Sequence, residues 1–108
     1  MKYDKTFYIL NRDGWDAQHP YYIEPVKACN CPYDDRLFIY KRENGIYVLT
    51  DKASGQSLKG GLTLKELKKW FIEKGKDAFE RVMNNHLLDY DKRVQDYKRL
   101  LEALWKEI

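Results

Sequence analysis

The amino-acid sequence changes its pattern once, at Gly60–Gly61. Before this pair, short runs of β-branched and aromatic residues alternate with turn-forming clusters, which is typical of strands. After it, apolar residues recur every three or four positions, which is typical of amphipathic helices. Strands and helices that are segregated along the chain indicate the α+β class. Because 108 residues suffice for one hydrophobic core, we expect a single domain over 1–108, β-rich over 1–59 and helical over 62–108.

The strongest local signal in the β-rich half is Asn44–Gly45, which lies between two runs of β-forming residues. Both residue types tolerate the positive φ angles of tight hairpin turns. A two-residue turn would pair Tyr40 with Leu49, whereas a three-residue turn with a bulge at Gly45 would pair Ile39 with Leu49. The sequence leaves both registers open.

Further strands are expected on both sides of this hairpin. Thr6–Leu10 and Tyr21–Lys27 are rich in β-forming residues, and Gln56–Leu58 can add a short strand. Pro25 lacks the N–H group that a ladder requires, so its strand is at an edge, bulged or short. We therefore predict an antiparallel meander of three to five strands, followed by two or three helices of which the last is long and heptad-like.

The first helix has explicit start and stop signals. Thr63 and Glu66 have the spacing of a capping box, in which each side chain satisfies a backbone N–H group of the other. Leu62 and Leu67 are placed to form a hydrophobic staple. Gly75 has the character of a C′ residue that ends the helix.

A second helical stretch starts near Asp77 and runs towards Ile108, with Asn84–His86 as a possible interruption. Its apolar residues follow a heptad pattern that, continued as one helix over 83–108, would be about 39 Å long. The a positions are Leu87, Val94, Leu101 and Ile108, and the d positions are Met83, Tyr90, Tyr97 and Leu104. The stripe is either intramolecular core or a homodimer seam formed by Tyr90, Val94, Tyr97, Leu101, Leu104 and Ile108.

Charge and targeting signals limit the functional classes. Lys and Arg number 20 and Asp and Glu 17, a balance of +3 that neither demands nucleic acid nor excludes it. The longest apolar run, Phe7–Leu10, is far shorter than a membrane span, and no apolar segment of a signal peptide follows the N-terminus. We expect a soluble, cytoplasmic protein that does not enter membranes.

Residue types that bind metals or act as nucleophiles are present but poorly arranged. His19, Cys29, Cys31 and His86 include zinc-ligand types, yet Cys-x-Cys is tighter than the usual knuckle and no second cysteine pair exists. The same residues could supply a thiol and a base, but no oxyanion-loop signature accompanies them. The acidic residues, Asp34 and Asp35 among them, lie among turn residues and indicate solvated loops. We expect free thiols, no metal, no cofactor and no enzymatic activity.

Two groups of residues are candidates for binding a macromolecule. Lysines gather on the first helix and could contact phosphates or acidic surfaces, although a solvated helix face is the alternative. The chain also holds nine tyrosines and three tryptophans, residue types that dominate binding hot spots but also fill strands. The candidate partner-binding residues are Trp15, Tyr21, Tyr22, Tyr33, Lys65, Lys68 and Lys69.

The stretch from Arg36 to Phe71 reads as strand, Asn-Gly turn, strand, Thr50-Asp51-Lys52-x-Ser54-Gly55, then a capped helix. This order resembles a ββα arrangement of small phage and mobile-element proteins, among them anti-defence proteins of the anti-CRISPR kind. The resemblance covers about a third of the chain and assigns no functional residue. It implies a non-catalytic protein that inhibits or scaffolds a protein or ribonucleoprotein partner, often as a dimer. The alternative is a nucleic-acid-binding accessory protein that uses the lysine-rich first helix and exposed tyrosines.

Overall fold

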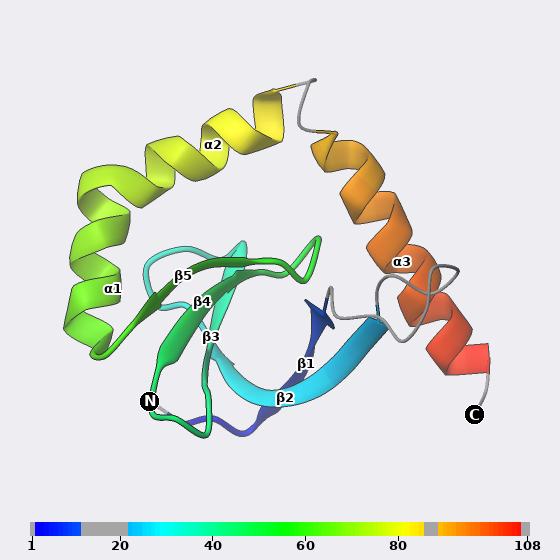
Figure 1. The fold of residues 1–108 in the computed structure, drawn as a ribbon, viewed down its shortest axis with the longest axis horizontal. Coiled ribbons are helices and arrows are strands. Elements are labelled where there is room, and N and C mark those ends of the chain that lie inside the picture. Colours follow the sequence, from blue (N-terminus) through cyan, green and yellow to red (C-terminus); the bar gives the residue numbers. More distant parts are fainter. Residues whose placement is uncertain (1, 12–21, 86–88, 107–108) are drawn as a thin grey trace.

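The computed structural model describes residues 2–11, 22–85 and 89–106 (Figure 1). The β-rich half forms a five-stranded antiparallel sheet in sequential order, so the predicted meander is confirmed. The strands are β1 (Lys5–Asn11), β2 (Tyr22–Asn30), β3 (Leu37–Lys41), β4 (Tyr47–Asp51) and β5 (Ser57–Gly61). The helices are α1 (Leu64–Trp70), the π-helical turn η1 (Phe71–Gly75), α2 (Lys76–Asn84) and α3 (Tyr90–Lys106), which gives the expected α+β architecture.

The β3–β4 hairpin adopts the second of the two predicted registers. Ile39 pairs with Leu49, and the Arg42 N–H donates to the Ile46 carbonyl at 2.8 Å. Three residues therefore form the loop, and Gly45 has a φ of +86°, a conformation that glycine adopts at little cost.

Strand β2 is shared unevenly between its neighbours. It pairs with β1 along Tyr22–Ala28, but with β3 only along Ala28–Asn30. Pro25 thus lies where β2 has one partner strand, which is how the ladder tolerates the missing N–H group.

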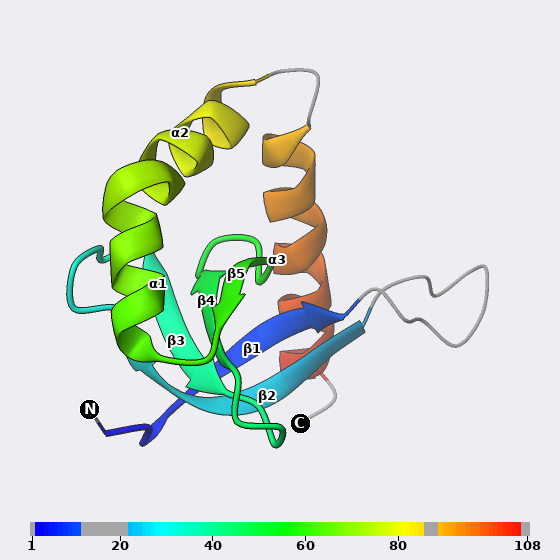
Figure 2. The ribbon, with the colours of Figure 1, turned by 60° about the vertical axis from the view of Figure 1, so that its left-hand side comes forward.

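The two faces of β3 and β4 bury different clusters. Leu37, Ile39 and Leu49 face the helices, whereas Phe38 and Val48 face the opposite side. That opposite side is covered by the sheet itself, because β1 and β2 run at a steep angle to β3 and β4 (Figure 2). On it, the Phe7 ring of β1 stacks on the Phe38 ring, with 4.5 Å between the ring centroids. The Leu10 N–H donates to the Gly55 carbonyl at 2.8 Å, which joins β1 to the β4–β5 turn.

Gly75 does not end the first helix, so this prediction is wrong. The chain continues from α1 through η1 into α2, and Gly75 has an ordinary helical φ of −68°. The residue is needed for a different reason: a Cβ at this position would lie 2.3 Å from Cζ3 of Trp70. The indole occupies the space that any larger residue would fill.

The π turn keeps one apolar face towards the sheet. Leu67, Phe71, Gly75 and Phe79 are buried and spaced by four residues. In a regular α-helix each such step rotates the side chain by about 40°, so the stripe would turn away from the core. The wider π turn offsets this rotation.

The second helical stretch is also shorter than predicted. Helix α2 ends at Asn84 and α3 begins at Tyr90, so Met83 and Tyr90 belong to different helices and no single helix runs over 83–108. Asp89, with a positive φ of 49°, precedes α3 and marks the break in the helical path. The described part of α3 has 17 residues and is about 26 Å long.

Helix α3 is held by the end of β4 and by β1. The Tyr90 hydroxyl donates to Oδ2 of buried Asp51 at 2.6 Å, and the Tyr97 hydroxyl donates to the Tyr8 carbonyl. Asp51 also accepts from the Ser54 hydroxyl at 2.7 Å, so its carboxylate is well satisfied inside the protein.

Candidate functional site

The start of α1 positions the predicted lysines. The Thr63 hydroxyl accepts from the Glu66 N–H at 3.1 Å, and the Glu66 carboxylate accepts from the Leu62 N–H at 3.0 Å. The Thr63 half of the capping box is thus confirmed, whereas the reciprocal half is wrong because Glu66 accepts from the Leu62 N–H and not from the Thr63 N–H. The predicted staple is wrong: Leu67 is buried on the inner face of α1, whereas the Leu62 residue is 71% exposed.

A small pocket lies beside this helix start. Its volume is about 350 Å³, and it is lined by Pro32, Tyr33, Ile39, Leu64, Lys65 and Lys68. The structure therefore brings together Tyr33, Lys65 and Lys68, three of the residues that the sequence singled out. We call this the α1 pocket.

The walls of the α1 pocket are apolar and its rim is cationic. Tyr33 is half-buried with its ring 5.3 Å from the Phe71 ring, and burial together with the Cys31 thiol raises the pKa of its hydroxyl. Lys65 and Lys68 are exposed, so their ammonium groups have access to solvent beside the opening. Such a site suits an apolar group that has negative charge next to it.

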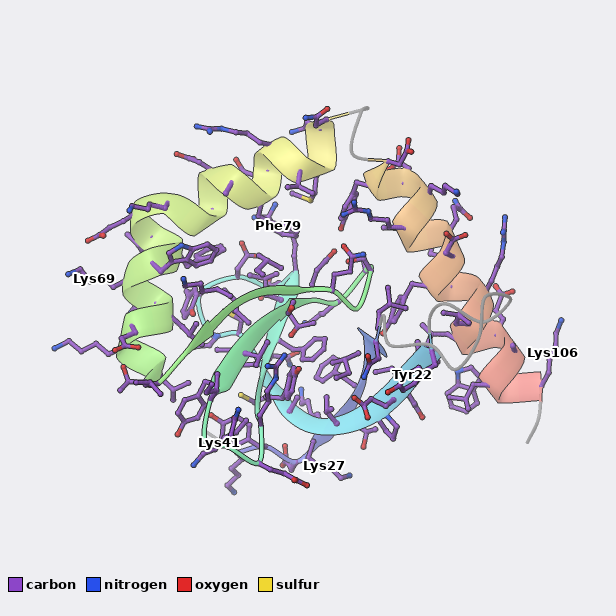
Figure 3. The ribbon with its side chains drawn as sticks, in the orientation of Figure 1. Tyr22, Lys27, Lys41, Lys69, Phe79 and Lys106 are labelled. Carbon is purple, nitrogen blue, oxygen red and sulfur yellow. The ribbon has the colours of Figure 1, made fainter. Side chains whose placement is uncertain are left out.

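The outer surface of the same helix extends this character. Lys69 points away from the sheet, whereas Phe79 on α2 points towards it (Figure 3). Ile72 follows one turn after Lys68 and Lys69 and is 66% exposed, a large value for an isoleucine. Together with Leu62, it supplies apolar surface on both sides of the lysines. We define the α1 face as the α1 pocket together with Leu62, Lys69 and Ile72.

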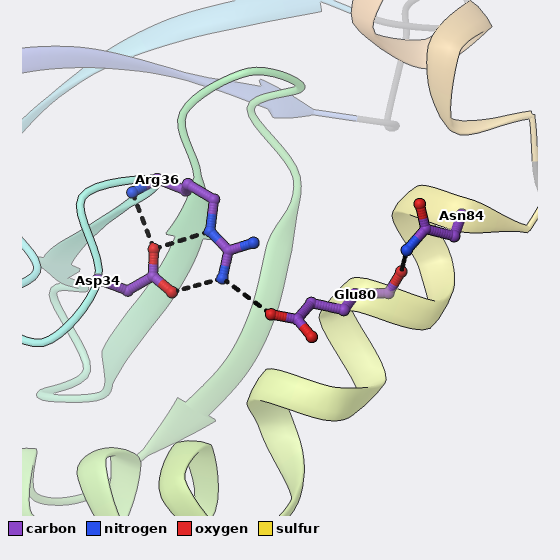
Figure 4. Close-up of polar contacts among 4 residues, drawn as sticks. All are labelled: Asp34, Arg36, Glu80 and Asn84. Atoms are coloured by element: carbon purple, nitrogen blue, oxygen red, sulfur yellow. Dashed lines mark hydrogen bonds and ion pairs between the residues drawn. The ribbon is translucent and has the colours of Figure 1, made fainter.

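An ion-pair cluster holds the loop that supplies Pro32 and Tyr33 (Figure 4). Nε and Nη2 of Arg36 donate to the two carboxylate oxygens of Asp34 at 2.9 and 2.7 Å, and Nη2 lies 3.7 Å from Oε1 of Glu80 on α2. The Arg36 guanidinium also lies 5.0 Å from the centroid of the Phe79 ring. Arg36 holds the pKa of the Asp34 carboxyl below its ordinary value.

Sequence reasoning missed this cluster. It treated Asp34 as a solvated loop charge, and that prediction is wrong because Arg36 binds the carboxylate through both oxygens. The available signal was the Asp34-x-Arg36 spacing, which lets an arginine fork close on a carboxylate in the same loop.

The other aromatic candidates do not join the α1 face. Tyr22 is half-buried at the start of β2, on the side of the molecule away from Lys69 (Figure 3). Trp15 and Tyr21 lie outside the described residues. Other rings have lysines near them: Lys41 lies 5.4 Å from the Tyr47 centroid, and Lys59 lies 5.9 Å from the centroid of Trp70 on α1.

The cysteines are part of the core. Cys29 and Cys31 are free and buried on the same face of the sheet, and burial raises the pKa of both thiols. A raised pKa keeps a thiol protonated and makes it a poor nucleophile. Over residues 2–11, 22–85 and 89–106, no group of three His, Cys, Asp or Glu side chains is arranged to hold a metal ion. His19 and His86 lie outside these ranges.

The predicted dimer residues are divided between two environments. Tyr90 and Tyr97 make intramolecular hydrogen bonds, and Tyr97 is buried, which agrees with the core alternative for these two positions. Val94, Leu101 and Leu104 are half-buried on α3, and Ile108 lies outside the described residues. For these positions the dimer seam stays a prediction.

Comparison of the chain with protein-family models, with curated proteins and with solved structures found no match. Among the described helices, none combines the length and the apolar character that a membrane crossing requires.

Proposed function

We propose that this protein is a non-catalytic binding protein that inhibits or scaffolds a protein partner, which docks on the α1 face. The partner presents a bulky apolar side chain to the α1 pocket, and carboxylates beside that side chain meet Lys65 and Lys68. The observation that carries the proposal is the convergence of Tyr33, Lys65 and Lys68 on one pocket.

Three features support this proposal. The α1 pocket is small and apolar inside, as expected for a hot spot that receives one anchor residue. Exposed Leu62 and Ile72, which precede and follow the lysines along the chain, add apolar area that a phosphate backbone would not use. The bidentate Arg36–Asp34 pair fixes the β2–β3 loop, so less conformational entropy is lost when the partner binds.

The resemblance to phage and mobile-element proteins suggests the wider role. Under this proposal the partner belongs to a large host assembly, a protein or a ribonucleoprotein, and docking blocks or scaffolds that assembly. Val94, Leu101 and Leu104 on α3, next to Trp105, would form the seam of a homodimer that presents two copies of the α1 face. Trp105 is 66% exposed, so the isolated chain leaves this part of α3 uncovered.

The alternative, nucleic-acid binding through Lys65, Lys68 and Lys69, is weaker on two counts. Single strands are bound by exposed aromatic rings on which bases stack. Of the described sheet tyrosines, Tyr40 is buried, Tyr8 and Tyr22 are half-buried, and Tyr47 has Lys41 near its ring. Glu66 on α1 and Glu73 on η1 also lie among these lysines and reduce the net positive charge of this part of the chain.

Peptide phage display on the immobilised protein tests the proposal directly. We expect enriched peptides with one bulky apolar residue flanked by Asp or Glu. Their affinity should fall by about tenfold or more in a Lys65→Glu, Lys68→Glu double variant. The matched control is Lys92→Glu with Lys98→Glu on the exposed part of α3, which should bind as the wild type does.

A labelled single-stranded oligonucleotide is titrated in parallel. Strongly salt-dependent oligonucleotide binding that disappears in the Lys65, Lys68 variant, without enrichment of any acidic peptide, would replace the proposal by the nucleic-acid alternative.

A further inference from the structure

A second cavity lies away from the α1 face, between the helices and the last two strands. Its volume is about 520 Å³, within the range of small-molecule sites. Helix α2 contributes Ala78 and Val82, α3 contributes Tyr90 and Arg93, and the β4–β5 region contributes Gln56 and Leu58. Figure 1 shows α1 and α3 on opposite sides of β5, with α2 between them. We call this the interhelical cavity.

About half of the wall of the interhelical cavity is apolar, and the rest is polar. Val82 and Leu58 line it, and so does the Trp70 indole. The indole is fixed in place because it packs directly on Gly75, where no Cβ intervenes. These side chains can contact the apolar part of a small ligand.

Among the described residues, Arg93 is the one cation that lines this cavity, and it is poorly satisfied. Its guanidinium donates a single hydrogen bond to another described residue, to Oε1 of Gln56 at 3.3 Å. Within the described ranges it forms no ion pair, although the residue is half-buried. A guanidinium carries five N–H donors in a planar fork that matches a carboxylate, so most of its hydrogen-bonding capacity is unused.

The nearby carboxylate does not satisfy Arg93. Asp51 also lines the cavity, but its oxygens accept from the Tyr90 hydroxyl, the Ser54 hydroxyl and the Ala53 N–H. This negative charge disfavours a dianion in the same cavity, whereas a single negative charge is balanced by Arg93.

From these observations we infer that the interhelical cavity binds a small apolar monocarboxylate, of the size of a two-ring aromatic acid. The carboxylate accepts from the free N–H groups of Arg93, and the ring system lies between Trp70 and the aliphatic wall. This inference does not depend on the proposed function, because the α1 face and the interhelical cavity share no residue.

Isothermal titration calorimetry with 1-naphthaleneacetate, and with its uncharged amide, tests the inference. We expect one-to-one binding of the acid with a dissociation constant below roughly 1 mM, and binding of the amide at least about tenfold weaker. Arg93→Gln should remove this preference by weakening binding of the acid alone. Arg99→Gln, the same change on the exposed side of α3, should leave the affinity unchanged.

A second variant keeps the test valid if Arg93→Gln does not fold. Ala78 is exposed on α2 and lines the cavity, so Ala78→Phe fills the space without disturbing a buried contact. It should abolish binding of both ligands. The inference is overturned if the acid does not bind to the wild type, if acid and amide bind equally, or if a folded Arg93→Gln or Ala78→Phe variant binds the acid as the wild type does.

Discussion

The contact between Gly75 and Trp70 predicts how Gly75→Ala changes the free energy of unfolding. The substitution should be destabilising when Trp70 is present and stabilising when Trp70 is replaced. Gly75 has helical backbone angles, so Gly75→Ala gains about 1 kcal/mol of helix propensity. The new Cβ would lie 2.3 Å from Cζ3 and 2.7 Å from Cε3 of Trp70, so the indole must move. Displacing a packed ring costs about 1–3 kcal/mol, and we expect a net loss of about 1 kcal/mol.

The same substitution should become stabilising when the indole is removed. Trp70→Leu keeps an apolar side chain but lacks the ring atoms that a Cβ at position 75 would meet. In this background Gly75→Ala should raise the free energy of unfolding by about 0.5–1 kcal/mol, because only the propensity gain remains. The coupling between the two positions is then about 2 kcal/mol.

Urea denaturation followed by far-ultraviolet circular dichroism measures all four proteins of this cycle without relying on tryptophan fluorescence. If Gly75 instead ended the helix in a left-handed conformation, Gly75→Ala would lower the free energy of unfolding by about 1 kcal/mol in both backgrounds. The strain would then lie in the backbone of residue 75 and would not depend on Trp70. A destabilising effect of equal size with and without the indole would therefore refute the structural explanation.

Three further predictions concern the contacts that hold α3 and the β2–β3 loop. Tyr90→Phe removes a donor from buried Asp51 and should lower the free energy of unfolding in urea by about 1–3 kcal/mol; Tyr47→Phe, a matched control, should change it by much less. Burial raises the pKa of Tyr97 to about 12, above the value of about 10 in an unfolded chain, so the unfolded state releases its proton first. Stability should be fully present below about pH 10 and fall as the pH rises towards 12, and Tyr97→Phe should flatten this fall in urea midpoints; an unchanged slope would contradict the assignment. Arg36→Met should cost about 1 kcal/mol in the same assay, and Arg36→Lys should recover little of it because the paired hydrogen bonds need the guanidinium fork; full recovery by lysine would indicate a simple charge effect.

The candidate α1 face was predictable in part. Residue type alone makes Tyr33, Lys65 and Lys68 candidates, and the structure places them around one pocket. The apolar walls, Ile39 and Leu64, were not chosen, because an apolar residue in a strand or helix looks like core until the packing is known.

The sequence by itself determined the features that depend on neighbouring residues. The Asn44–Gly45 turn and the Thr63 cap follow from backbone preferences and from hydrogen bonds within about four residues, and both are found where the sequence puts them. The change from strands to helices at Gly60–Gly61 is equally local, because side-chain periodicity is read along the chain.

Only the tertiary structure decided how these elements face one another. The sequence predicts that Gly75 ends a helix. In the structure, the Trp70 indole packs against Gly75 and occupies the space that a side chain at position 75 would need. Leu62 looked like half of a staple, but its supposed partner Leu67 is used by the core. The roles of Gly75 and Leu67 both depend on which face of the helices α1, η1 and α2 packs on the sheet. That face is determined by the π turn and by contacts between residues far apart in the sequence.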